Sequence, residues 1–123
     1  MLATNSCLHH TLHPHRPCNV PSTTQLEVEI IVLPNRSLQF TYLLSGELTY
    51  FKIPDKTAPQ RADNLWRHTC FEAFIRAHKS QAYLEFNFSP AGQWQAYTFT
   101  DYRVGTELDT AMAPDITCQL APP

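Results

Sequence analysis

The chain has 123 residues, enough for one compact domain and too few for two of ordinary size. Hydrophobic residues make up 43% of the sequence and aromatic residues 11%, which excludes a disordered or fibrous chain. Nine basic and eleven acidic side chains give a net charge of −2, which excludes a broad electrostatic surface for nucleic acid or for an anionic membrane.

Apolar residues recur with a period of two along most of the chain, which predicts β-strands rather than helices. Residues 1–11 are expected to form a flexible segment, and a weak first strand is expected to start near residue 12. Turn residues at 34–36 and 45–47 then separate the first three strong strands. These strands are expected at residues 26–33, 38–44 and 48–53.

Residues 54–64 show no periodicity and contain two prolines, so we expect a loop that is long enough to have a functional role. Short connections suited to antiparallel neighbours separate the three strands that follow. These strands are expected at residues 69–77, 82–89 and 94–100.

Residues 116–120 resemble the beginning of a further strand, although the sequence ends at Pro123. We therefore expect the C-terminal end of the fold to be truncated. An uncovered sheet edge would then be available for pairing between two copies of the chain.

Alternation divides the residues of two neighbouring strands, 69–77 and 82–89, between two faces of a sheet. One set is wholly apolar, and we expect its large members to be buried against a facing sheet: Phe71, Ile75, Leu84, Phe86 and Phe88. The opposite set is mostly polar and comprises Cys70, Glu72, Phe74, Arg76, Tyr83, Glu85, Asn87 and Ser89. Because a slip of one residue would exchange the two sets, the register is expected to be strongly fixed.

The polar set combines the groups that a polyhydroxylated ligand requires. The carboxylates of Glu72 and Glu85 and the amide of Asn87 can bond to hydroxyl groups, while nearby aromatic faces can cover the C–H surface of a sugar. An antiparallel sheet with one face in water also needs polar residues on that face. A merely solvated face is therefore the alternative interpretation, and it is the commoner arrangement.

Two groups of aromatic and basic residues lie at predicted loop ends and could form a stacking platform. The first group consists of Trp66, Arg67 and His68. The second group consists of Trp94, Tyr97, Tyr102 and Arg103. The alternative is that the two tryptophans close the ends of the core, which is the more frequent role of a tryptophan near a strand end.

No enzyme class is indicated. Glu72 and Glu85 could be considered as the general acid and base of a glycosidase, which needs two carboxyl groups about 5 to 9.5 Å apart. However, any two carboxylates on facing strands can lie at that distance. No nucleophile motif, phosphate loop or zinc-protease motif accompanies them. No metal site is expected either, because the spacing of the histidines between Cys7 and Cys18 fits no usual zinc pattern.

The sequence contains neither an apolar stretch long enough for a membrane span nor a recognisable secretory signal, so a cytoplasmic location is expected. The cysteines, Cys7, Cys18, Cys70 and Cys118, show no C-x-x-C spacing, which favours reduced thiols. A Cys7–Cys18 disulfide is plausible only if the protein is exported.

Two long motifs resemble a known family. They are LWRHTCFEAF at residues 65–74 and EFNFSPAGQW at residues 85–94, the second continuing through Tyr97 to the DYR sequence at 101–103. Together they resemble the bacterial DOMON-like proteins, relatives of the carbohydrate-binding modules of family nine, over residues 12–114. The resemblance implies a β-sandwich of jelly-roll type in a superfamily whose members bind sugars or haem. The calcium-binding carboxylates and paired tryptophans of the sugar-binding relatives have no positional match in this chain.

Together these features predict an all-β, antiparallel jelly-roll sandwich over residues 12–123. The predicted function is a non-catalytic module that binds a small molecule, with carbohydrate as the ligand class and no cofactor. The alternatives are a haem-binding electron-transfer domain, with His68 or Met112 as an axial ligand, and a structural module without a small ligand. The predicted ligand-binding residues are Trp66, Arg67, His68, Glu72, Glu85, Asn87, Trp94, Tyr97, Tyr102 and Arg103.

Overall fold

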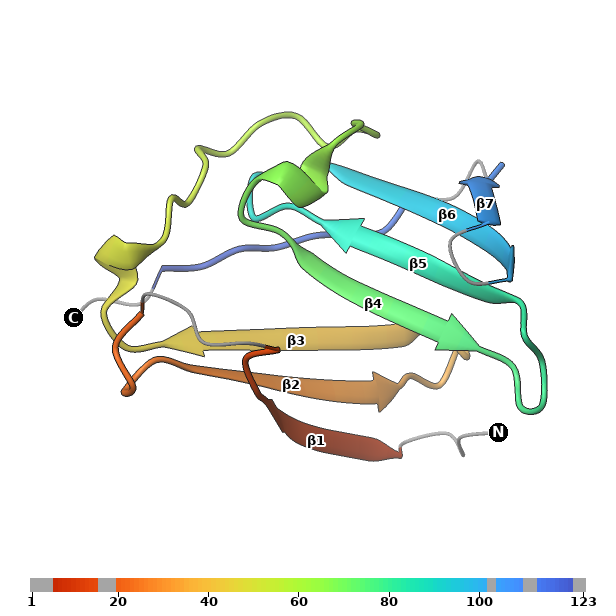
Figure 1. Ribbon diagram of the computed structural model, residues 1–123, viewed down its shortest axis with the longest axis horizontal. Coiled ribbons are helices and arrows are strands. Elements are labelled where there is room, and N and C mark those ends of the chain that lie inside the picture. Colours follow the sequence, from red (N-terminus) through yellow and green to blue (C-terminus); the bar gives the residue numbers. More distant parts are fainter. Residues whose placement is uncertain (1–5, 16–19, 102–103, 110–112, 121–123) are drawn as a thin grey trace. The chain divides into compact units, whose positions relative to one another are not determined.

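The computed structural model describes residues 6–15, 20–101, 104–109 and 113–120, and these residues form two compact units. The N-terminal unit is Met1–Tyr50 and the C-terminal unit is Phe51–Pro123. Each unit contains one antiparallel sheet (Figure 1). Across the described residues there are seven strands, two single-turn 3-10 helices and no α-helix, so the all-β prediction is confirmed. None of the helices in this part of the chain has the length and apolar character needed to cross a membrane.

The sheet of the N-terminal unit has three strands in the order β1-β2-β3. They are β1 (Cys7–Leu12), β2 (Gln25–Val32) and β3 (Leu38–Ser45) (Figure 1). Val28 and Val32 on the central strand are its buried apolar residues. Two cross-strand partners of β2, Phe40 and Tyr42, lie on β3 with stacked rings whose centroids are 6.4 Å apart.

The predicted turn at residues 34–36 is confirmed, whereas residues 45–47 contain only a bend at Gly46, and each change of direction depends on local chemistry. In the first, Asn35 Oδ1 accepts hydrogen bonds from the backbone N–H and the hydroxyl of Ser37. In the second, Gly46 has a φ of +114°, and a Cβ added there would lie 3.0 Å from Cα of Thr24. A side chain at position 46 would therefore be strained and crowded at once.

Two predictions for the N-terminal unit are wrong. Residues 1–11 were expected to be flexible, yet residues 7–12 form β1 and pair with β2 from Cys7↔Ile31 to Leu12↔Leu26. All six residues of β1 are exposed, so backbone hydrogen bonding maintains this edge strand without a hydrophobic period that the sequence could reveal.

Residues 48–53 were expected to form a strand, but Leu48–Tyr50 is a 3-10 helix and residues 51–53 lie outside any strand. The Glu47 carboxylate accepts hydrogen bonds from the hydroxyl of Thr49 at 2.9 Å and from its backbone N–H at 3.4 Å. Such local bonds from a side chain compete with the pairing that a strand needs.

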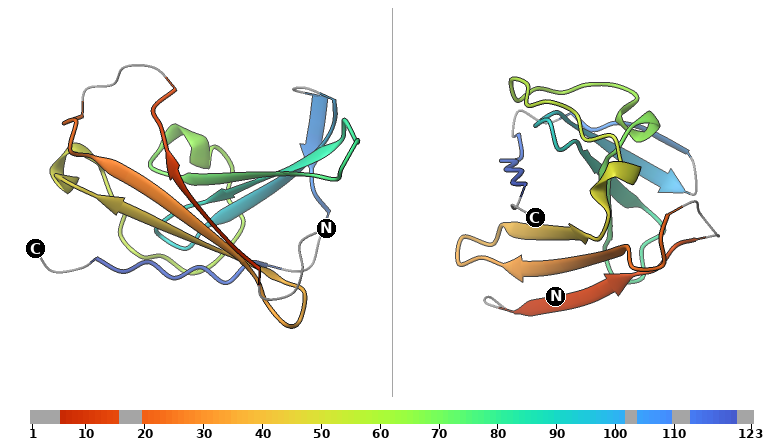
Figure 2. Two further views of the ribbon diagram at one scale, coloured as in Figure 1. Left: turned by 90° about the horizontal axis from the view of Figure 1, so that it is seen from below. Right: turned by 90° about the vertical axis from the view of Figure 1, so that its left-hand side faces the viewer.

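The sheet of the C-terminal unit has four strands in the order β4-β5-β6-β7 (Figure 1). They are β4 (Phe71–Arg76), β5 (Tyr83–Phe88), β6 (Trp94–Asp101) and β7 (Val104–Glu107). Strand β7 has no counterpart in the sequence prediction. Residues 116–120, which were expected to begin a strand, run as an extended chain outside any strand (Figure 2).

The predicted division between faces is confirmed by the register of β4 and β5. Phe71 pairs with Phe88 and Ile75 with Leu84 on one face, while Glu72 pairs with Asn87 on the other. The predicted burial is wrong in part, because the five large apolar residues are half-buried and the largest fully buried side chains of the described residues are the polar Asn87 and Gln95. On the apolar face the small residue Ala96 is completely buried, at 0% exposure, while the larger residues Phe71, Ile75, Leu84, Phe86 and Phe88 retain exposed surface.

Candidate functional site

Three rows of side chains cross the polar face of the C-terminal sheet. The rows follow from the strand register, because residues opposite one another on neighbouring strands project from the same face. The first row is Arg76, Tyr83, Phe99 and Gly105. The second row is Phe74, Glu85, Tyr97 and Glu107. The third row is Glu72, Asn87 and Gln95. We call this surface the β4–β7 polar face.

Gln95 is the hydrogen-bonding centre of this face, and its side chain is 2% exposed. Its Oε1 accepts a hydrogen bond from Arg61 Nε at 3.0 Å. Its Nε2 donates to Asp63 Oδ1 at 3.1 Å and to Glu107 Oε1 at 3.3 Å. One buried amide therefore joins the 54–64 loop, β6 and β7.

Arg61 connects the loop to the beginning of β6. Its backbone forms a parallel bridge to Trp94, and its guanidinium lies 4.7 Å from the centroid of the Trp94 ring. The guanidinium also donates to the backbone carbonyl of Leu108, and its Nε lies 3.9 Å from Glu107 Oε1. These contacts give the predicted functional loop a definite role, since they bring Asp63 to the polar face.

Asn87 and Glu85 form a second polar pair on β5. Asn87 is fully buried, with 0% exposure. When its amide is oriented so that the nitrogen meets acceptors, Nδ2 donates to Glu85 Oε2 at 3.0 Å and to the carbonyl of Phe86 at 3.2 Å. A buried amide with these partners holds the neighbouring carboxylate in a fixed position.

Desolvation raises the pKa values of acidic groups here, and neighbouring negative charge adds to the rise at Glu72 and Cys70. Desolvation raises the pKa of Glu85, and the hydrogen bond from Asn87 partly opposes that rise. The pKa of Glu72 is raised by desolvation and then by the charge of Glu85. Desolvation, with these two carboxylates, raises the pKa of Cys70 to about 11. These two carboxyl groups and the Cys70 thiol are therefore harder to ionise than the same groups in water.

Aromatic rings adjoin the carboxylates on the same face. Tyr83 and Phe99 stack with centroids 4.7 Å apart and planes 3° from parallel. Phe74 is 60% exposed, and the centroid of its ring lies 6.2 Å from that of Tyr83. The ring centroids of Tyr97 and Phe99 are 6.3 Å apart. We call these four residues the aromatic strip. The sequence analysis had placed Phe74 and Tyr83 on the polar face without giving either a stacking role.

The predicted loop-end residues do not form one platform. Trp66 lies in the 3-10 helix Leu65–Arg67, with 56% exposure and the Arg67 guanidinium 5.0 Å from its ring centroid. His68 is exposed at the end of that helix. Trp94 is only 5% exposed, and strand alternation directs it to the face opposite Tyr97. Its ring therefore offers no open surface for stacking.

Three further residues from the sequence predictions, Tyr102, Arg103 and Met112, lie outside the described residues. The site residues that the sequence analysis missed are Arg61, Asp63, Gln95 and Glu107. Gln95 could have been found, because it has the same strand parity as Tyr97. The sequence holds no comparable signal that Arg61 and Asp63 meet Gln95, since that contact joins a loop to a distant strand.

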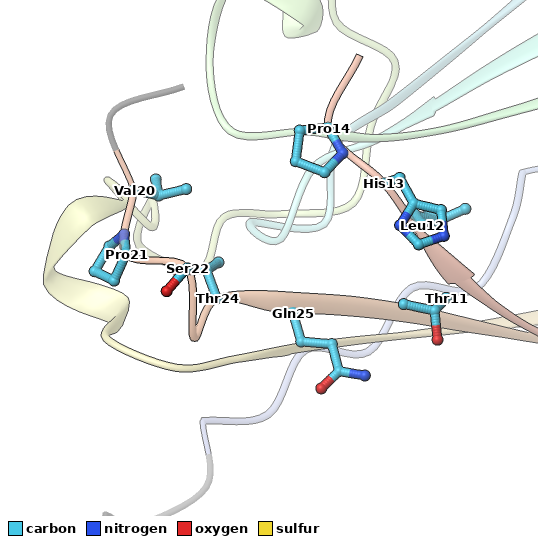
Figure 3. Close-up of a pocket in the computed structure, with 9 residues that line it drawn as sticks. All are labelled: Thr11, Leu12, His13, Pro14, Val20, Pro21, Ser22, Thr24 and Gln25. Carbon is cyan, nitrogen blue, oxygen red and sulfur yellow. The ribbon is translucent and has the colours of Figure 1, made fainter. Parts of the chain in front are cut away.

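Two surface hollows among the described residues, one in each unit, include no predicted site residue. The hollow of the N-terminal unit, of about 330 Å³, lies between the end of β1 and the approach to β2 (Figure 3). Thr24 lines it, and its buried hydroxyl has no hydrogen-bond partner among the described residues. The hollow of the C-terminal unit, of about 320 Å³, is lined by residues from 53–59, 90–92 and 116–120.

Comparison with known proteins adds no family assignment: no family model, no curated protein and no solved structure matches the chain significantly. The resemblance to the DOMON-like proteins therefore stays a prediction. Among the described residues, no group of three or more histidine, cysteine, aspartate or glutamate side chains is arranged to hold a metal ion.

The raised pKa of Glu85 predicts a specific pH dependence of stability. A carboxyl group whose pKa rises on folding binds more protons in the folded than in the unfolded chain between its two pKa values. The free energy of unfolding therefore falls as the pH rises through that interval, and the loss persists above it. We expect Glu85→Gln to remove this part of the fall, as measured by urea unfolding at a series of pH values.

The matched control is Asp55→Asn, which removes one negative charge from an exposed position of the same unit. It should leave the pH dependence as it is in the wild type. An identical decline with pH in wild type and Glu85→Gln would contradict the assignment of this effect to Glu85.

Proposed function

We propose that the protein is a non-catalytic ligand-binding module of the DOMON-like β-sandwich type, and that its β4–β7 polar face binds carbohydrate. The observation that carries this proposal is the position of the aromatic strip, with Phe74 60% exposed, beside the carboxylates of Glu72 and Glu85. The aromatic rings lie in the first and second rows of this face, and the two carboxylates lie in the second and third rows. A single ligand could therefore contact both kinds of group.

Sugar recognition needs both kinds of group at this spacing. The C–H surface of a pyranose ring packs against an aromatic face, while carboxylate and amide oxygens accept hydrogen bonds from its hydroxyl groups. Neighbouring strands lie about 5 Å apart, so adjacent members of one row are separated by close to the width of one sugar ring. A ring resting on Phe74 would have the Glu85 carboxylate directly beside it, since the two residues are cross-strand partners.

The electrostatics favour binding over hydrolysis. A general acid and base pair needs two carboxyl groups whose environments push their pKa values apart. The pKa values of Glu72 and Glu85 are both raised, and desolvation is the main cause for each. Two groups shifted in the same direction for the same reason are poorly suited to opposite roles in one reaction.

The test compares three aromatic residues that are almost equally exposed to solvent but lie on different surfaces of the protein. Phe74→Ala removes a ring of the aromatic strip, Trp66→Ala removes the ring predicted at the loop end, and Tyr50→Ala is the control, with exposures of 60%, 56% and 57%. We expect Phe74→Ala to weaken sugar binding about tenfold, which corresponds to roughly 1.4 kcal/mol, and Tyr50→Ala to leave it unchanged. Calorimetry over a panel of mono- and oligosaccharides measures the affinities.

A hydrolysis assay on the same sugars accompanies the calorimetry. Equal affinities for wild type and Phe74→Ala would place the ligand elsewhere and contradict the proposed site. Reducing sugar released by wild type but not by Glu72→Gln would show an enzyme instead. Absence of heat with every sugar would favour the structural module without a small ligand.

A further inference from the structure

We propose that two copies of the chain pair through the outer edge of β1, so that their N-terminal sheets join into one continuous antiparallel sheet about a two-fold axis. This interaction surface belongs to the N-terminal unit, and the proposal is independent of the function proposed for the β4–β7 polar face. It is drawn from the backbone hydrogen bonds of β1, from its side chains and from the symmetric spacing of its outward residues.

The outer side of β1 carries backbone groups that the described residues leave unpaired. The strand lies at the edge of its sheet (Figure 1), and in the described part of the chain it pairs with β2 alone. The carbonyl of Ser6 accepts a hydrogen bond from the N–H of Val32 at 3.2 Å, so the even-numbered residues direct their backbone groups toward β2. In an antiparallel pair the odd-numbered residues then direct theirs away from it. The outward residues are Cys7, His9 and Thr11.

These outward residues are spaced symmetrically about His9, which makes the edge complementary to itself. When a second copy approaches in the antiparallel direction with its His9 opposite His9, Cys7 of each copy meets Thr11 of the other. Each such pair exchanges two hydrogen bonds, so every outward N–H and C=O of the strand gains a partner. Any other antiparallel register leaves at least one of the three residues unpaired, and the strand therefore specifies its own register.

The side chains of β1 permit this approach. The strand contains no proline, lysine, arginine, aspartate or glutamate, which are residues that commonly block pairing at a sheet edge. The imidazole of His9 reaches back over its own sheet, where Nε2 lies 3.3 Å from Glu27 Oε1. On the opposite face Leu8 and Leu12 are 39% and 42% exposed, and this register places Leu8 of one copy diagonally opposite Leu12 of the other. Pairing therefore buries apolar surface that otherwise contacts water.

The other sheet edges differ from β1 in ways that the experiment can use. Strand β4 carries the charged residues Glu72 and Arg76, and β7 has only four residues beside a register shift between Phe99 and Asp101. Charges, short strands and irregular pairing all disfavour the addition of a strand. Strand β3 is the other edge of the N-terminal sheet, but pairing of β1 with β3 of a second copy is not symmetric and gives an open-ended assembly instead of a closed dimer.

A disulfide tests the register directly. Thr11→Cys places a thiol opposite the partner's Cys7 at a Cα–Cα separation of about 5.5 Å, which is within the range for a disulfide. Within one chain, positions 7 and 11 are about 13 Å apart along the strand, so the two thiols cannot join there. We expect mild oxidation to convert most Thr11→Cys chains to a covalent dimer, with the link between positions 7 and 11 identified by mass spectrometry. Leu12→Cys is the matched control, because its side chain projects from the opposite face and should form no such link.

Sedimentation velocity measures the association without a covalent link. We expect wild type to dimerise as its concentration rises, and Thr11→Pro to weaken the dimer by at least about tenfold, because proline lacks the N–H that donates to the partner's Cys7. Thr11→Val keeps this N–H and a β-branched shape, so it should dimerise like the wild type. Urea unfolding checks that Thr11→Pro is folded, as expected for a proline whose missing N–H faces outward from a sheet edge.

Three results would overturn the proposal. The first is a wild type that stays monomeric at high concentration together with a Thr11→Cys variant that forms no link between positions 7 and 11. The second is a dimer of unchanged affinity in folded Thr11→Pro, which would place the contact on another surface. The third is growth beyond a dimer, which would require a second edge such as β3. None of these results affects sugar binding at the β4–β7 polar face, which calorimetry measures separately.

Discussion

Replacing Gln95 by leucine is expected to lower the free energy of unfolding of the C-terminal unit by about 3 kcal/mol. The substitution keeps an apolar stem of similar size but deletes one acceptor and two donors from a side chain that is 2% exposed. Arg61, Asp63 and Glu107 each lose a hydrogen bond to the same amide.

The magnitude follows from what these partners lose and from how much water reaches them. Breaking a fully buried charged contact costs about 3 to 5 kcal/mol, and a single hydrogen bond to a charged group contributes about 1.5 to 3 kcal/mol. The side chains of Arg61 and Glu107 are 29% and 55% exposed, so water replaces part of the loss. The expected loss of unfolding free energy therefore lies at the lower end of the range for a fully buried charged contact, at about 3 kcal/mol.

Gln95→Glu is the informative second variant. It preserves the shape and the acceptor for Arg61, but it turns two donated hydrogen bonds into contacts between like charges at Asp63 and Glu107. Its destabilisation should therefore diminish as the pH falls and the introduced carboxyl group becomes protonated, whereas that of Gln95→Leu should change far less with pH. Urea unfolding followed by tryptophan fluorescence measures both variants, since Trp94 is buried in the same unit. A cost below about 1 kcal/mol for Gln95→Leu would contradict a central role for this amide.

The sequence predicted those parts of this fold that depend on the pattern of residues close together in the chain. Alternation in β4 and β5 is strict, so the common face of Glu72 and Asn87 and the opposite face of Phe71 and Phe88 could be predicted, although the exact partners could not. The turn around Asn35 was equally visible, because a short polar side chain bonds to the backbone two residues on.

The rest depends on contacts that no local pattern reports. Strand β1 is exposed along its whole length, so it lacks the apolar period that marks a strand. Arg61 and Gln95 are 34 residues apart, and their hydrogen bond follows from a bridge between a loop and a sheet edge. Alternation correctly gave Asn87 its face, but its complete burial depends on the side chains that surround it after folding.

Substituting Gly105 by alanine is expected to displace the Phe99 ring and thereby disrupt the aromatic strip. A Cβ at position 105 would lie 2.4 Å from Cδ1 of Phe99 and 2.7 Å from Cγ, closer than van der Waals contact allows. Phe99 stacks on Tyr83 on β5, so the ring cannot move away from β7 without disturbing that pair. We expect a cost of about 1 to 3 kcal/mol in stability, as is typical of overpacking, together with a loss of ligand affinity.

A double-mutant cycle with Phe99→Ala separates this contact from any effect on the backbone. Gly105 does not have the positive φ that disfavours a side chain, so removing the ring should remove most of the cost of Gly105→Ala. Gly92→Ala is the matched control, because its cost arises from a φ of +107° and should be the same with or without the Phe99 ring. If Gly105→Ala costs as much in the Phe99→Ala background as in wild type, the ring is not what the added methyl group meets. Coupling confined to Gly105 and Phe99 would instead mean that a glycine on β7 allows the Phe99 ring to lie against Tyr83.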